Sequence, residues 1–588
     1  MLRYVRQRMS VPGIETRRPA RTSSSPKFRD RYAIDVLRAV WSAPKSIVVA
    51  NLSPNHQKKN SIMRPVTPST AQAGWPRELF PSALESATAR LRSAVTARIG
   101  ADGAVRDPCH SRILESILAL NLLERTGLAP ERRIRLIDYL CAQTPADPLD
   151  RLLLDLALTR AEVEGAPRGL AEAFLVQAPQ FTGARKQAMF DAIFALYGLP
   201  PGGPLDPAGF SLAGLHCWAV AQVTAVKIVL ADATGQSDRI GDEDVRILLE
   251  TQHGSHVWES NVLIFLWVLH ALHRLPGTKD VVTDGVAKVM EHQRADGGMP
   301  FVSDTDTWCT ATAGVALAAA HAPRHVLDAV ASNLVSRQQP GGGWSYTDLS
   351  WQTDVDDTSV AVQFLHGLDA GRYREQIARG RRSLLAVRNP DGGFPTYIAG
   401  AESEACMTAA AVDALTPDWH RHAEAITTGL EYLARQQSPD GSFPPDWSSS
   451  RHHTVFRALL AATRNPGHRP ASLRTMTDRI MTLVLDGQHG DGGWGQQDGR
   501  ASDPISTAYA LVAVCRQDDP APAARAVAYL LEHQRDDGTI GSISDSIGPR
   551  PLRFTVPVLA DIFTLLALGH LTRRLGAPDD PASGERAI

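Results

Sequence analysis

The residues most able to do chemistry are three carboxylic acids within five positions, Asp354-Val355-Asp356-Asp357-Thr358. Two adjacent carboxylates in a site without water resist double ionisation, so we expect Asp356 and Asp357 to share one proton. The third acid, Asp354, or a donor from a helix start can orient the pair. Such a group could act as a general acid. The same run of acids would also suit the solvated start of a helix.

A glycine-rich loop recurs along the C-terminal half of the chain. The last residues of six such loops lie 45 to 51 positions apart, and they are Met299, Trp344, Phe394, Phe443, Trp494 and Ile540. Self-similarity at a near-fixed period indicates a repeat architecture. Most loops are followed by a threonine that opens an alanine-rich apolar run, namely Thr310, Thr358, Thr408, Thr454 and Thr507. Aligning the repeats on this threonine distinguishes residue types that recur in most copies from those that occur in one copy only.

In this alignment an acid recurs four positions before the threonine, at Asp306, Asp354, Glu404 and Asp503. A residue type kept in most copies serves the repeat itself, and we expect it to cap a helix. In the two positions just before the threonine, the other copies read Trp308-Cys309, Cys406-Met407, His452-His453 and Ile505-Ser506. Only one copy carries acids there, which predicts that Asp356 and Asp357 are site residues rather than scaffold.

The alignment also proposes neighbours for the acids. The residues that hold the position of Asp356 in other copies are Trp308, Cys406, His452 and Ile505. Trp308 is the best candidate to stabilise a cation, because an aromatic face attracts positive charge without capturing it, although core packing would also explain it. His452 or His453 could hydrogen-bond the acids, and a surface position is the alternative.

Helices should position these residues. Segments 506–514 and 311–320 are rich in good helix formers and show no strand-like alternation. A second amphipathic helix precedes each loop, as in 524–534. Kelch propellers share the period and the paired glycines but need four short strands per repeat, which are not seen. One repeat is therefore helix, loop, helix, and such pairs close naturally into a ring. Residues 75–280 are also helical but lack clean loops, which suggests a diverged helical domain.

Composition excludes several classes of protein. The 588 residues carry a formal net charge of −2, so there is no global case for binding nucleic acid. The six cysteines lack Cys-x-x-Cys spacing, which argues against a disulfide framework and a zinc knuckle. No apolar run reaches the length of a membrane-spanning helix, so we expect a soluble, cytoplasmic protein without integral membrane association. Residues 1–62 are an exception, being basic and rich in Arg, Ser and Pro. They suggest a disordered extension, with a transit peptide or a nucleic-acid arm as alternatives.

The Gln-x(2–5)-Gly-x-Trp loops and the single Asp-x-Asp-Asp-Thr motif together resemble the class II terpene cyclases, the family of squalene–hopene cyclases and copalyl or drimenyl diphosphate synthases. The resemblance spans roughly residues 75–570, and segment 107–116 looks like the N-terminal part of bacterial members with diphosphate substrates. It implies an all-α fold of two α-barrel domains, with γ inserted after the first helix of β. The expected parts are a disordered basic extension at 1–73, the first β-domain helix at 74–95, the γ domain at 96–280, the β domain at 281–571 and a loose tail at 572–588.

The resemblance also implies a reaction. The middle acid of the motif, Asp356, would protonate an alkene or epoxide in a cavity between the domains. Only Trp344 and Trp494 keep the loop tryptophan, whereas hopene cyclases usually keep more and carry an apolar membrane-docking segment that is not seen here. No Asp-Asp-x-x-Asp motif lies in a helical context, so the product should retain its diphosphate. We therefore expect farnesyl or geranylgeranyl diphosphate to become a drimenyl- or copalyl-type bicyclic diphosphate.

An isoprenoid diphosphate needs cations and often Mg²⁺. Candidates for holding it in the γ region are Arg185, Lys186 and Lys227. Lys227 lies in an apolar run where an unpaired charge is costly, and snorkelling to the surface is the alternative. The run Asp242-Glu243-Asp244 could help to hold Mg²⁺, but its spacing differs from the family's acidic motif, and it also suits a helix start.

Three alternatives remain from the sequence alone. Within the family, the chain could be a squalene-type triterpene cyclase. A zinc α/α barrel like the protein prenyltransferases would need Asp, Cys and His to converge on the metal, and Cys309 and His321 show no recognisable set. A non-catalytic repeat scaffold is the third. The length of the substrate, the stereochemistry, the terminating base and the oligomeric state stay open.

Overall fold

The computed structural model describes residues 74–159, 169, 183–199, 201, 203–466 and 470–576. The predicted basic extension at 1–73 lies outside the described residues, as does the end of the predicted tail. Contacts group residues 63–588 into one compact unit, apart from 1–62. The described part is helical, with short strands of two residues that pair antiparallel, such as Ser111–Arg112 (β1) with Met299–Pro300 (β2). None of the described helices combines the length and apolarity needed to cross a bilayer.

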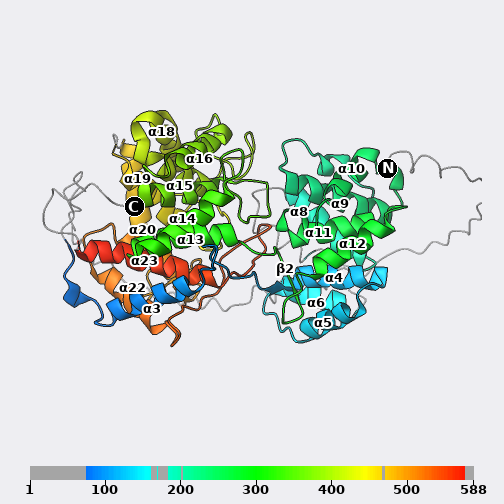
Figure 1. The fold of residues 1–588 in the computed structure, drawn as a ribbon, viewed down its shortest axis with the longest axis horizontal. Coiled ribbons are helices and arrows are strands. Elements are labelled where there is room, and N and C mark those ends of the chain that lie inside the picture. The colour runs from blue at the N-terminus through cyan, green and yellow to red at the C-terminus, as the bar shows by residue number, and fades with distance from the viewer. Residues whose placement is uncertain are drawn as a thin grey trace, which may run out of the picture. The chain divides into compact units, whose positions relative to one another are not determined.

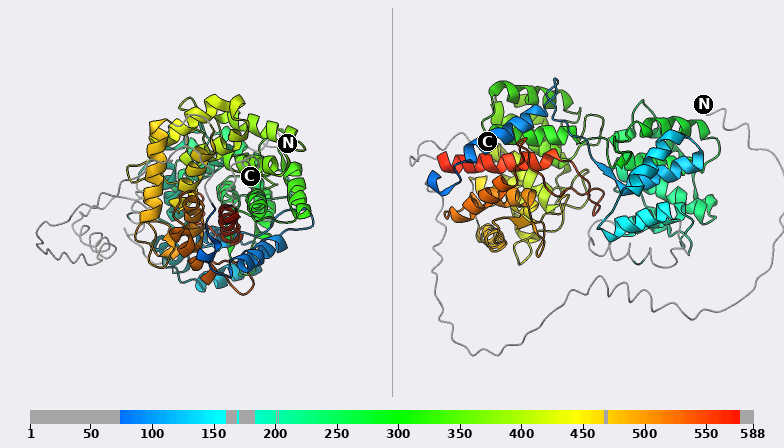
Figure 2. Two further views of the ribbon diagram at one scale, coloured as in Figure 1. Left: turned by 90° about the vertical axis from the view of Figure 1, so that its left-hand side faces the viewer. Right: turned by 90° about the horizontal axis from the view of Figure 1, so that it is seen from below.

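A ring of inner helices forms the first helical body (Figure 2, left). Its members are α13 (Asp306–Ala319), α15 (Val355–Asp369), α17 (Ala405–Leu415), α19 (His452–Arg464), α21 (Pro504–Val514) and α23 (Val558–Gly576). Each packs on the next, and α23 packs back on α13, so the ring closes. Most residues of these helices are buried. Alanine is frequent in α13 and α17, where a small side chain lets neighbouring backbones approach closely.

An outer layer of amphipathic helices surrounds this ring. Its members are α3 (Leu84–Ala97), α14 (Arg324–Arg337), α16 (Arg374–Val387), α18 (Trp419–Gln436), α20 (Ala471–Asp486) and α22 (Ala521–Glu532). Short 3₁₀ turns, η1 (Arg77–Leu79) and η5 (Thr416–Asp418), lead into α3 and α18. Helix α3 packs on α22 and α23 although it comes from the N-terminal side of the chain, so it completes the outer layer (Figure 1).

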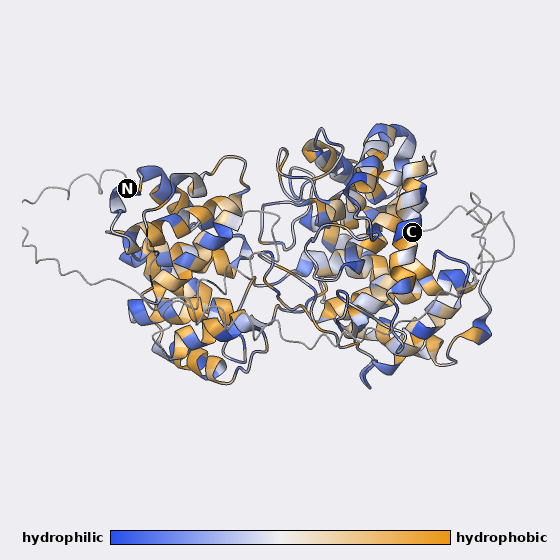
Figure 3. Cartoon of the chain, turned by 180° about the vertical axis from the view of Figure 1, so that it is seen from behind, coloured by the Kyte–Doolittle hydropathy of each residue, from blue (hydrophilic) through white to orange (hydrophobic). Residues whose placement is uncertain are grey.

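The intervening residues form a second helical body. Its helices are α4 (Ile113–Thr126), α5 (Pro130–Cys141), α6 (Pro148–Leu158), α8 (Gly183–Leu196), α9 (Cys217–Ala233), α10 (Asp242–Glu250), α11 (Val262–Leu272) and α12 (Lys279–Met290), with the 3₁₀ turns η2 (Pro207–Phe210), η3 (Ser237–Arg239) and η4 (Trp258–Ser260). Hydrophobic residues run along the helices of both bodies (Figure 3). The core of the second body extends from Ile113 to Met299, separate from that of the ring.

The expected boundaries need correction in three places. Helix α12 and Met299 pack in the second core, so that body continues past the boundary expected at 280. The first β-domain helix is Leu84–Ala97 rather than 74–95, because a 3₁₀ turn precedes it. Helix α23 runs to Gly576 and so takes in the beginning of the segment expected to be a loose tail.

Five of the six glycine-rich loops are held by the same contacts, and the loop at 388–394 has Arg388 in place of the glutamine. The glutamine Nε2 donates both to a glycine carbonyl of its own loop and to a carbonyl of another helix. These pairs are Gln293 to Gly297 and Arg132, Gln338 to Gly342 and Gln376, Gln437 to Gly441 and Met476, Gln488 to Gly492 and Pro522, and Gln534 to Gly538 and Ala87. The last pair ties the loop after α22 to α3. The repeat therefore specifies its own stacking, including the closure of the outer layer.

In three copies the repeat threonine fastens the loop to the following inner helix. The hydroxyls of Thr358, Thr408 and Thr507 accept hydrogen bonds from the backbone N–H of the loop aromatic residues, Trp344, Phe394 and Trp494. The recurrent acid caps its helix in only two copies: Asp354 accepts from the N–H of Asp357, and Asp503 from that of Ser506. Asp306 lies inside α13, and Glu404 makes no capping bond.

Strands β3 (Trp494–Gly495) and β4 (Ser502–Asp503) bring Asp503 back beside its loop, and an isolated bridge between Trp344 and Asp354 does the same in the copy that carries the acids. The scaffold thus fixes the start of α15 through backbone pairing before any side-chain chemistry is considered.

Candidate active site

Asp354 and Asp357 form a tightly coupled pair at the start of α15. Asp354 Oδ1 accepts the Asp357 N–H at 2.8 Å, and both side chains are buried. Burial raises the pKa of Asp354 to about 7 and that of Asp357 well above its usual range. The Asp354 carboxyl opposes ionisation of Asp357, whereas hydrogen bonds from Asp357 favour the ionised form of Asp354. The pair therefore retains a proton at neutral pH. The sequence predicted that Asp356 and Asp357 would share the proton, and this was wrong, because one helical turn folds the cap residue onto Asp357.

Asp356 has a different partner. The guanidinium of Arg457, on α19, forms an ion pair with Asp356 Oδ1, and both side chains are largely buried. The same guanidinium lies over the ring of Trp308, 5.6 Å from its centre, and its Nη1 is 3.6 Å from Cys406 Sγ. The repeat alignment found Trp308 and Cys406 as neighbours of the acid, but it gave no sign of Arg457.

The three acids line a cavity of about 520 Å³ to which both helical bodies contribute. This volume lies within the roughly 300–1,000 Å³ common for small-molecule sites. Much of the wall is aromatic, with Trp218, Trp308, Tyr346, Tyr397 and Trp447 among the lining residues. Trp218 lies edge-on to both Tyr346 and Tyr397, which connects a helix of the second body to loops of the first. Such rings can stabilise a carbocation, at about 0.5–2 kcal/mol each.

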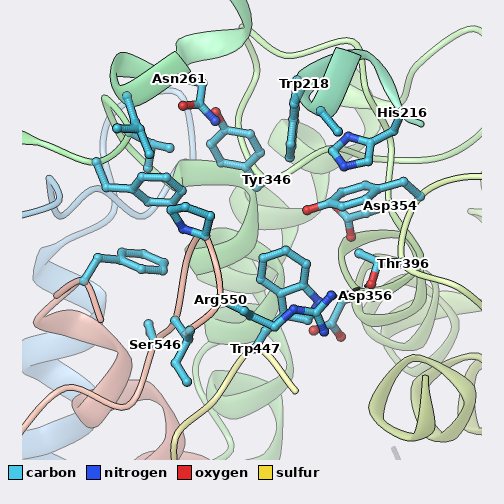
Figure 4. A pocket seen from close by; sticks show the side chains of 18 of the residues that line it. His216, Trp218, Asn261, Tyr346, Asp354, Asp356, Thr396, Trp447, Ser546 and Arg550 are labelled. Carbon is cyan, nitrogen blue, oxygen red and sulfur yellow. Dashed lines mark hydrogen bonds between the residues drawn. The ribbon is translucent and has the colours of Figure 1, made fainter. Parts of the chain in front are cut away.

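Cationic side chains line the same cavity. Arg185 and Lys186 reach it from α8, and Arg550 reaches it from the segment before α23. Burial, together with these neighbouring cations, lowers the pKa of Lys186 to about 7, and no carboxylate among the described residues pairs with its ammonium group. Arg550 binds Glu404 at 2.7 Å and lies over the ring of Trp447 at 4.3 Å. Figure 4 shows Arg550 and Trp447 close to Asp356, with His216 and Trp218 across the cavity. A buried lysine without a carboxylate partner among the described residues, beside a largely apolar cavity, suits an anionic ligand.

Glu259 connects the two bodies directly beside the acids. It lies in η4 of the second body with φ of +55°, and its side chain is buried. Its carboxylate accepts hydrogen bonds from Trp218 Nε1 at 3.0 Å, Ser350 Oγ at 2.5 Å and the backbone N–H groups of Trp351 and Gln352. These last residues immediately precede Asp354. The carboxylate therefore positions the segment that leads into the acid motif.

Two sets of predicted residues lie away from the cavity. Lys227 forms a salt bridge with Asp244 at 2.6 Å, so it is neither snorkelling nor available to a substrate. Asp244 also binds the N–H of Gly241, Glu243 pairs with Arg246, and Asp242 is exposed. The acidic run thus starts α10 and pairs with its own neighbours. It does not fit a magnesium site.

The two predicted histidines also differ. His453 lines the cavity, whereas His452 does not. His452 is buried, neither ring nitrogen has a partner among the described residues, and burial lowers its pKa to about 3. It is a buried core residue, away from the cavity wall on which a contact with substrate was predicted. Ile505 and Cys406 are likewise buried without lining the cavity.

Cys406, Asp446 and His453 lie close enough together to hold a metal ion, with ligand atoms within 4.8 Å of one another. This is the combination that a zinc α/α barrel would need, at positions other than Cys309 and His321. However, Arg457 already contacts Cys406 Sγ, and burial raises the pKa of that thiol well above its usual range. Zinc binds thiolate, and a fixed guanidinium repels a divalent cation. The three side chains therefore fit a hydrogen-bonded cluster better than a metal centre.

Known proteins resemble this chain over most of its length. Drimenyl diphosphate synthase of Streptantibioticus cattleyicolor is 40% identical over 500 residues, which span 82% of this chain and 93% of that protein. Drimenyl diphosphate synthase of Streptomyces showdoensis is 38% identical over 84% of this chain and 96% of that protein. The chain belongs to the class II terpene cyclases. The family predicted from the acid motif and the loops is thereby confirmed.

Two further comparisons concern one domain and the fold. Residues 323–573 of the cyclase match the squalene-hopene cyclase C-terminal domain. In fold, the cyclase resembles ent-copalyl diphosphate synthase from Streptomyces platensis, with a TM-score of 0.51 at 18% identity over 84% of this chain and all of that one. The predicted all-α architecture is confirmed.

Proposed function

We propose that this cyclase protonates farnesyl diphosphate and closes it into a drimenyl-type bicyclic diphosphate. The observation that carries the proposal is a cavity lined both by carboxylic acids and by Lys186, whose ammonium group pairs with no carboxylate among the described residues. Both relatives that match over most of the chain are named drimenyl diphosphate synthases, which supports the C15 substrate over the C20 one.

In this proposal Asp356 donates the proton. It is the least buried acid of the motif and lines the cavity. The ion pair with Arg457 belongs to the enzyme before substrate binds, and protonation of Asp356 releases it. The Asp354–Asp357 pair holds the nearest proton. Protonation of the terminal alkene gives a tertiary cation, which the two internal alkenes attack in turn to form two rings. The faces of Trp308 and Trp447 stabilise the charge as it moves.

We assign the diphosphate to Arg185, Lys186 and Arg550. Their charges oppose those of the phosphate oxygens, and guanidinium groups bind such oxygens through paired hydrogen bonds. Binding should also raise the pKa of Lys186 again, because an anion favours the charged ammonium group. No step breaks the C–O bond to the diphosphate, so the product keeps it.

Since the acidic run on α10 does not fit a magnesium site, we propose that Mg²⁺ enters as a complex with the substrate diphosphate. Chelation with EDTA should then lower turnover. It should leave the melting temperature of the free enzyme unchanged, because no protein site is emptied.

The test is to incubate the full chain separately with farnesyl diphosphate, geranylgeranyl diphosphate and squalene, with and without phosphatase before extraction. We expect a bicyclic C15 alcohol that appears only after phosphatase treatment. Conversion of squalene alone would support the triterpene cyclase alternative, and conversion of the C20 substrate alone would support a copalyl-type product. Absence of any cyclised product would contradict the proposed function.

A further inference from the structure

The proposed cyclisation is an isomerisation, so the proton given to the substrate at the start must be removed at the end. The last bicyclic cation loses a proton from a carbon next to the charge, which requires a base beside the cavity. An ionised acid that has just donated its proton can act in this way only if the cation returns to it. The bicycle, however, carries its final charge on the ring opposite the protonated carbon. A second group is therefore expected elsewhere on the wall.

His453 has the orientation that such a base requires. It lies in the first turn of α19 and lines the cavity. Its Nδ1 donates to Asp446 Oδ2 at 3.0 Å, and Asp446 also accepts from Thr454 Oγ1 and from the N–H of Ser448 at 2.6 Å. Against the effect of burial, the charge that His453 carries when protonated, together with these bonds, lowers the pKa of Asp446 to about 2. Because Nδ1 is engaged by Asp446, Nε2 is the ring nitrogen that remains to contact a ligand in the cavity that His453 lines.

The aromatic surroundings of His453 can stabilise a carbocation. Its ring contacts those of Phe456, Tyr509 and Phe563, with centres 5.9, 5.2 and 6.3 Å away. Tyr509 and Phe563 line the cavity themselves. Aromatic faces stabilise a cation without reacting with it, so a cation that reaches this wall meets the imidazole as a proton acceptor. The acid is on α15 and the imidazole on α19, with α17 between them in the ring.

The other acceptors on the cavity wall are less suitable. Glu404 is taken by Arg550 and by Thr396 Oγ1, and Asp545 by Ser448 Oγ and Tyr509 OH. His216 stacks on Tyr397 at 4.3 Å, and burial with the nearby cations Arg185 and Arg550 lowers its pKa to about 4, which makes it a weak base. Among the described lining residues, His453 is the imidazole that a carboxylate orients.

We propose that His453, oriented by Asp446, is the base that ends the reaction. A C–H bond next to the cationic carbon breaks, its electron pair forms the C=C bond, and the proton passes to Nε2 of His453. The resulting imidazolium donates from Nδ1 to the Asp446 carboxylate, which stabilises its charge. Loss of the Nε2 proton to solvent, and uptake of one by Asp356, complete the cycle. Asp446 is a positioning residue in this scheme, because it acts through the imidazole. The scheme rests on the proposed function.

The chain offers a matched control in the neighbouring histidine. His453→Gln and His452→Gln make the same change at adjacent positions, one on the cavity wall and one in the core. We expect His453→Gln to form the bicyclic alkene about 100-fold more slowly. The remaining cation should be captured by water, so the ratio of hydroxylated to alkene product should rise while KM changes less than about threefold. His452→Gln should keep the wild-type product ratio. Unchanged product ratios in His453→Gln would overturn the proposal.

Asp446→Asn provides a second measurement in case His453→Gln does not fold. It keeps the shape of the site but removes the charge that stabilises the imidazolium, so the product ratio should shift in the same direction by a smaller amount. If Asp446→Asn folds and yields the wild-type ratio, the assignment of the dyad is wrong. A failure of the proposed function is distinguishable, because the wild-type enzyme would then form no bicyclic product of any kind.

Discussion

At the scale of single residues, three acids within four positions behave differently because their partners differ. Asp354 and Asp357 are pressed together by one helical turn and hold a proton, whereas Asp356 points to the cavity and pairs with Arg457. Adjacent positions on a helix point about 100° apart, so neighbours in sequence need not share an environment. This division of roles leads to two predictions.

Asp356→Asn should lower cyclisation by at least about 100-fold, since an amide cannot donate the proton. The fold should be kept, because backbone pairing and the Asp354 cap define the start of α15. Turnover and circular dichroism of the purified variant check this. Asp369→Asn, at the far end of the same helix, serves as the control and should retain activity. Wild-type turnover in Asp356→Asn would show that another group is the acid.

The Asp354–Asp357 pair predicts a specific dependence of stability on pH. Its folded pKa values are raised above those of the unfolded chain, so the folded state binds more protons once the pH exceeds about 4. This stabilisation is complete below pH 4 and is lost as the pH rises through about 7. We expect the melting temperature to fall from pH 5 to pH 8 in the wild type, and to fall less in Asp357→Asn. Equal slopes in the two proteins would contradict the coupling.

At the scale of elements, each repeat consists of a glycine-rich loop that hydrogen bonds hold against the neighbouring helices. The tryptophan Nε1 atoms donate to carbonyls of the preceding outer helices, Trp344 to Leu334 and Trp494 to Val484, each at 2.7 Å, and both rings are fully buried. In the first of these loops the left-handed residue is Gly342, with φ of +96°. Gly343 is required for a different reason, since a Cβ there would stand 2.9 Å from Thr358 Oγ1. The loops are thus scaffold, while the helix starts that follow them carry the site.

Trp494→Ala should therefore cost roughly 3–5 kcal/mol of stability and leave the product unchanged. Trp308→Ala should do the reverse, because Trp308 is only partly buried and lines the cavity beside Arg457. We expect it to destabilise the fold modestly and to slow turnover or release early-terminated products. Melting curves and product profiles of both variants provide the measurement. Altered products from Trp494→Ala, with normal products from Trp308→Ala, would contradict this division.

At the scale of the whole molecule, the cavity exists because the two helical bodies contact each other there. Hydrogen bonds to Glu259 stabilise that contact. Its carboxylate satisfies donors from a helix of one body and from the segment before the acid motif of the other. A buried donor that loses its acceptor costs about 1–3 kcal/mol. The acids thus depend on a residue far from them in sequence.

Glu259→Gln should lower stability by about 3 kcal/mol or more, since the new amide presents its own hydrogens to several of the same donors. Activity should fall as well, because the segment leading into Asp354 loses its anchor. The free energy of unfolding and kcat are the measurements. Glu243→Gln is a suitable control: that side chain is exposed, and its change should stay within about 0.5 kcal/mol. Full activity in Glu259→Gln would show that the acids are positioned by α15 alone.

The sequence by itself determined the repeat, the helical class, the family and the acid motif. These features are local and periodic: glycine, glutamine and threonine recur because each copy must make the same loop contacts, and a copy that departs from the others stands out. The position of Trp308 on the cavity wall agrees with that alignment, whereas Cys406, His452 and Ile505, which align with Asp356 in the same way, do not line the cavity. The separate second helical body was also visible, because its helices lack the loops.

Only the tertiary structure decided the partners of those residues. Arg457, Arg550, Asp446 and Glu259 share no spacing with the acids, and each reaches the site from a different element. The one signal for Arg457 in the sequence is its place within the run Val455–Ala462 of α19, where a charged residue stands among apolar ones. The distances across the closed ring and between helices decide which charged groups pair and which acids share a proton. They also decide that Lys227 pairs with Asp244. These distances follow from packing, which a pattern along one chain does not record.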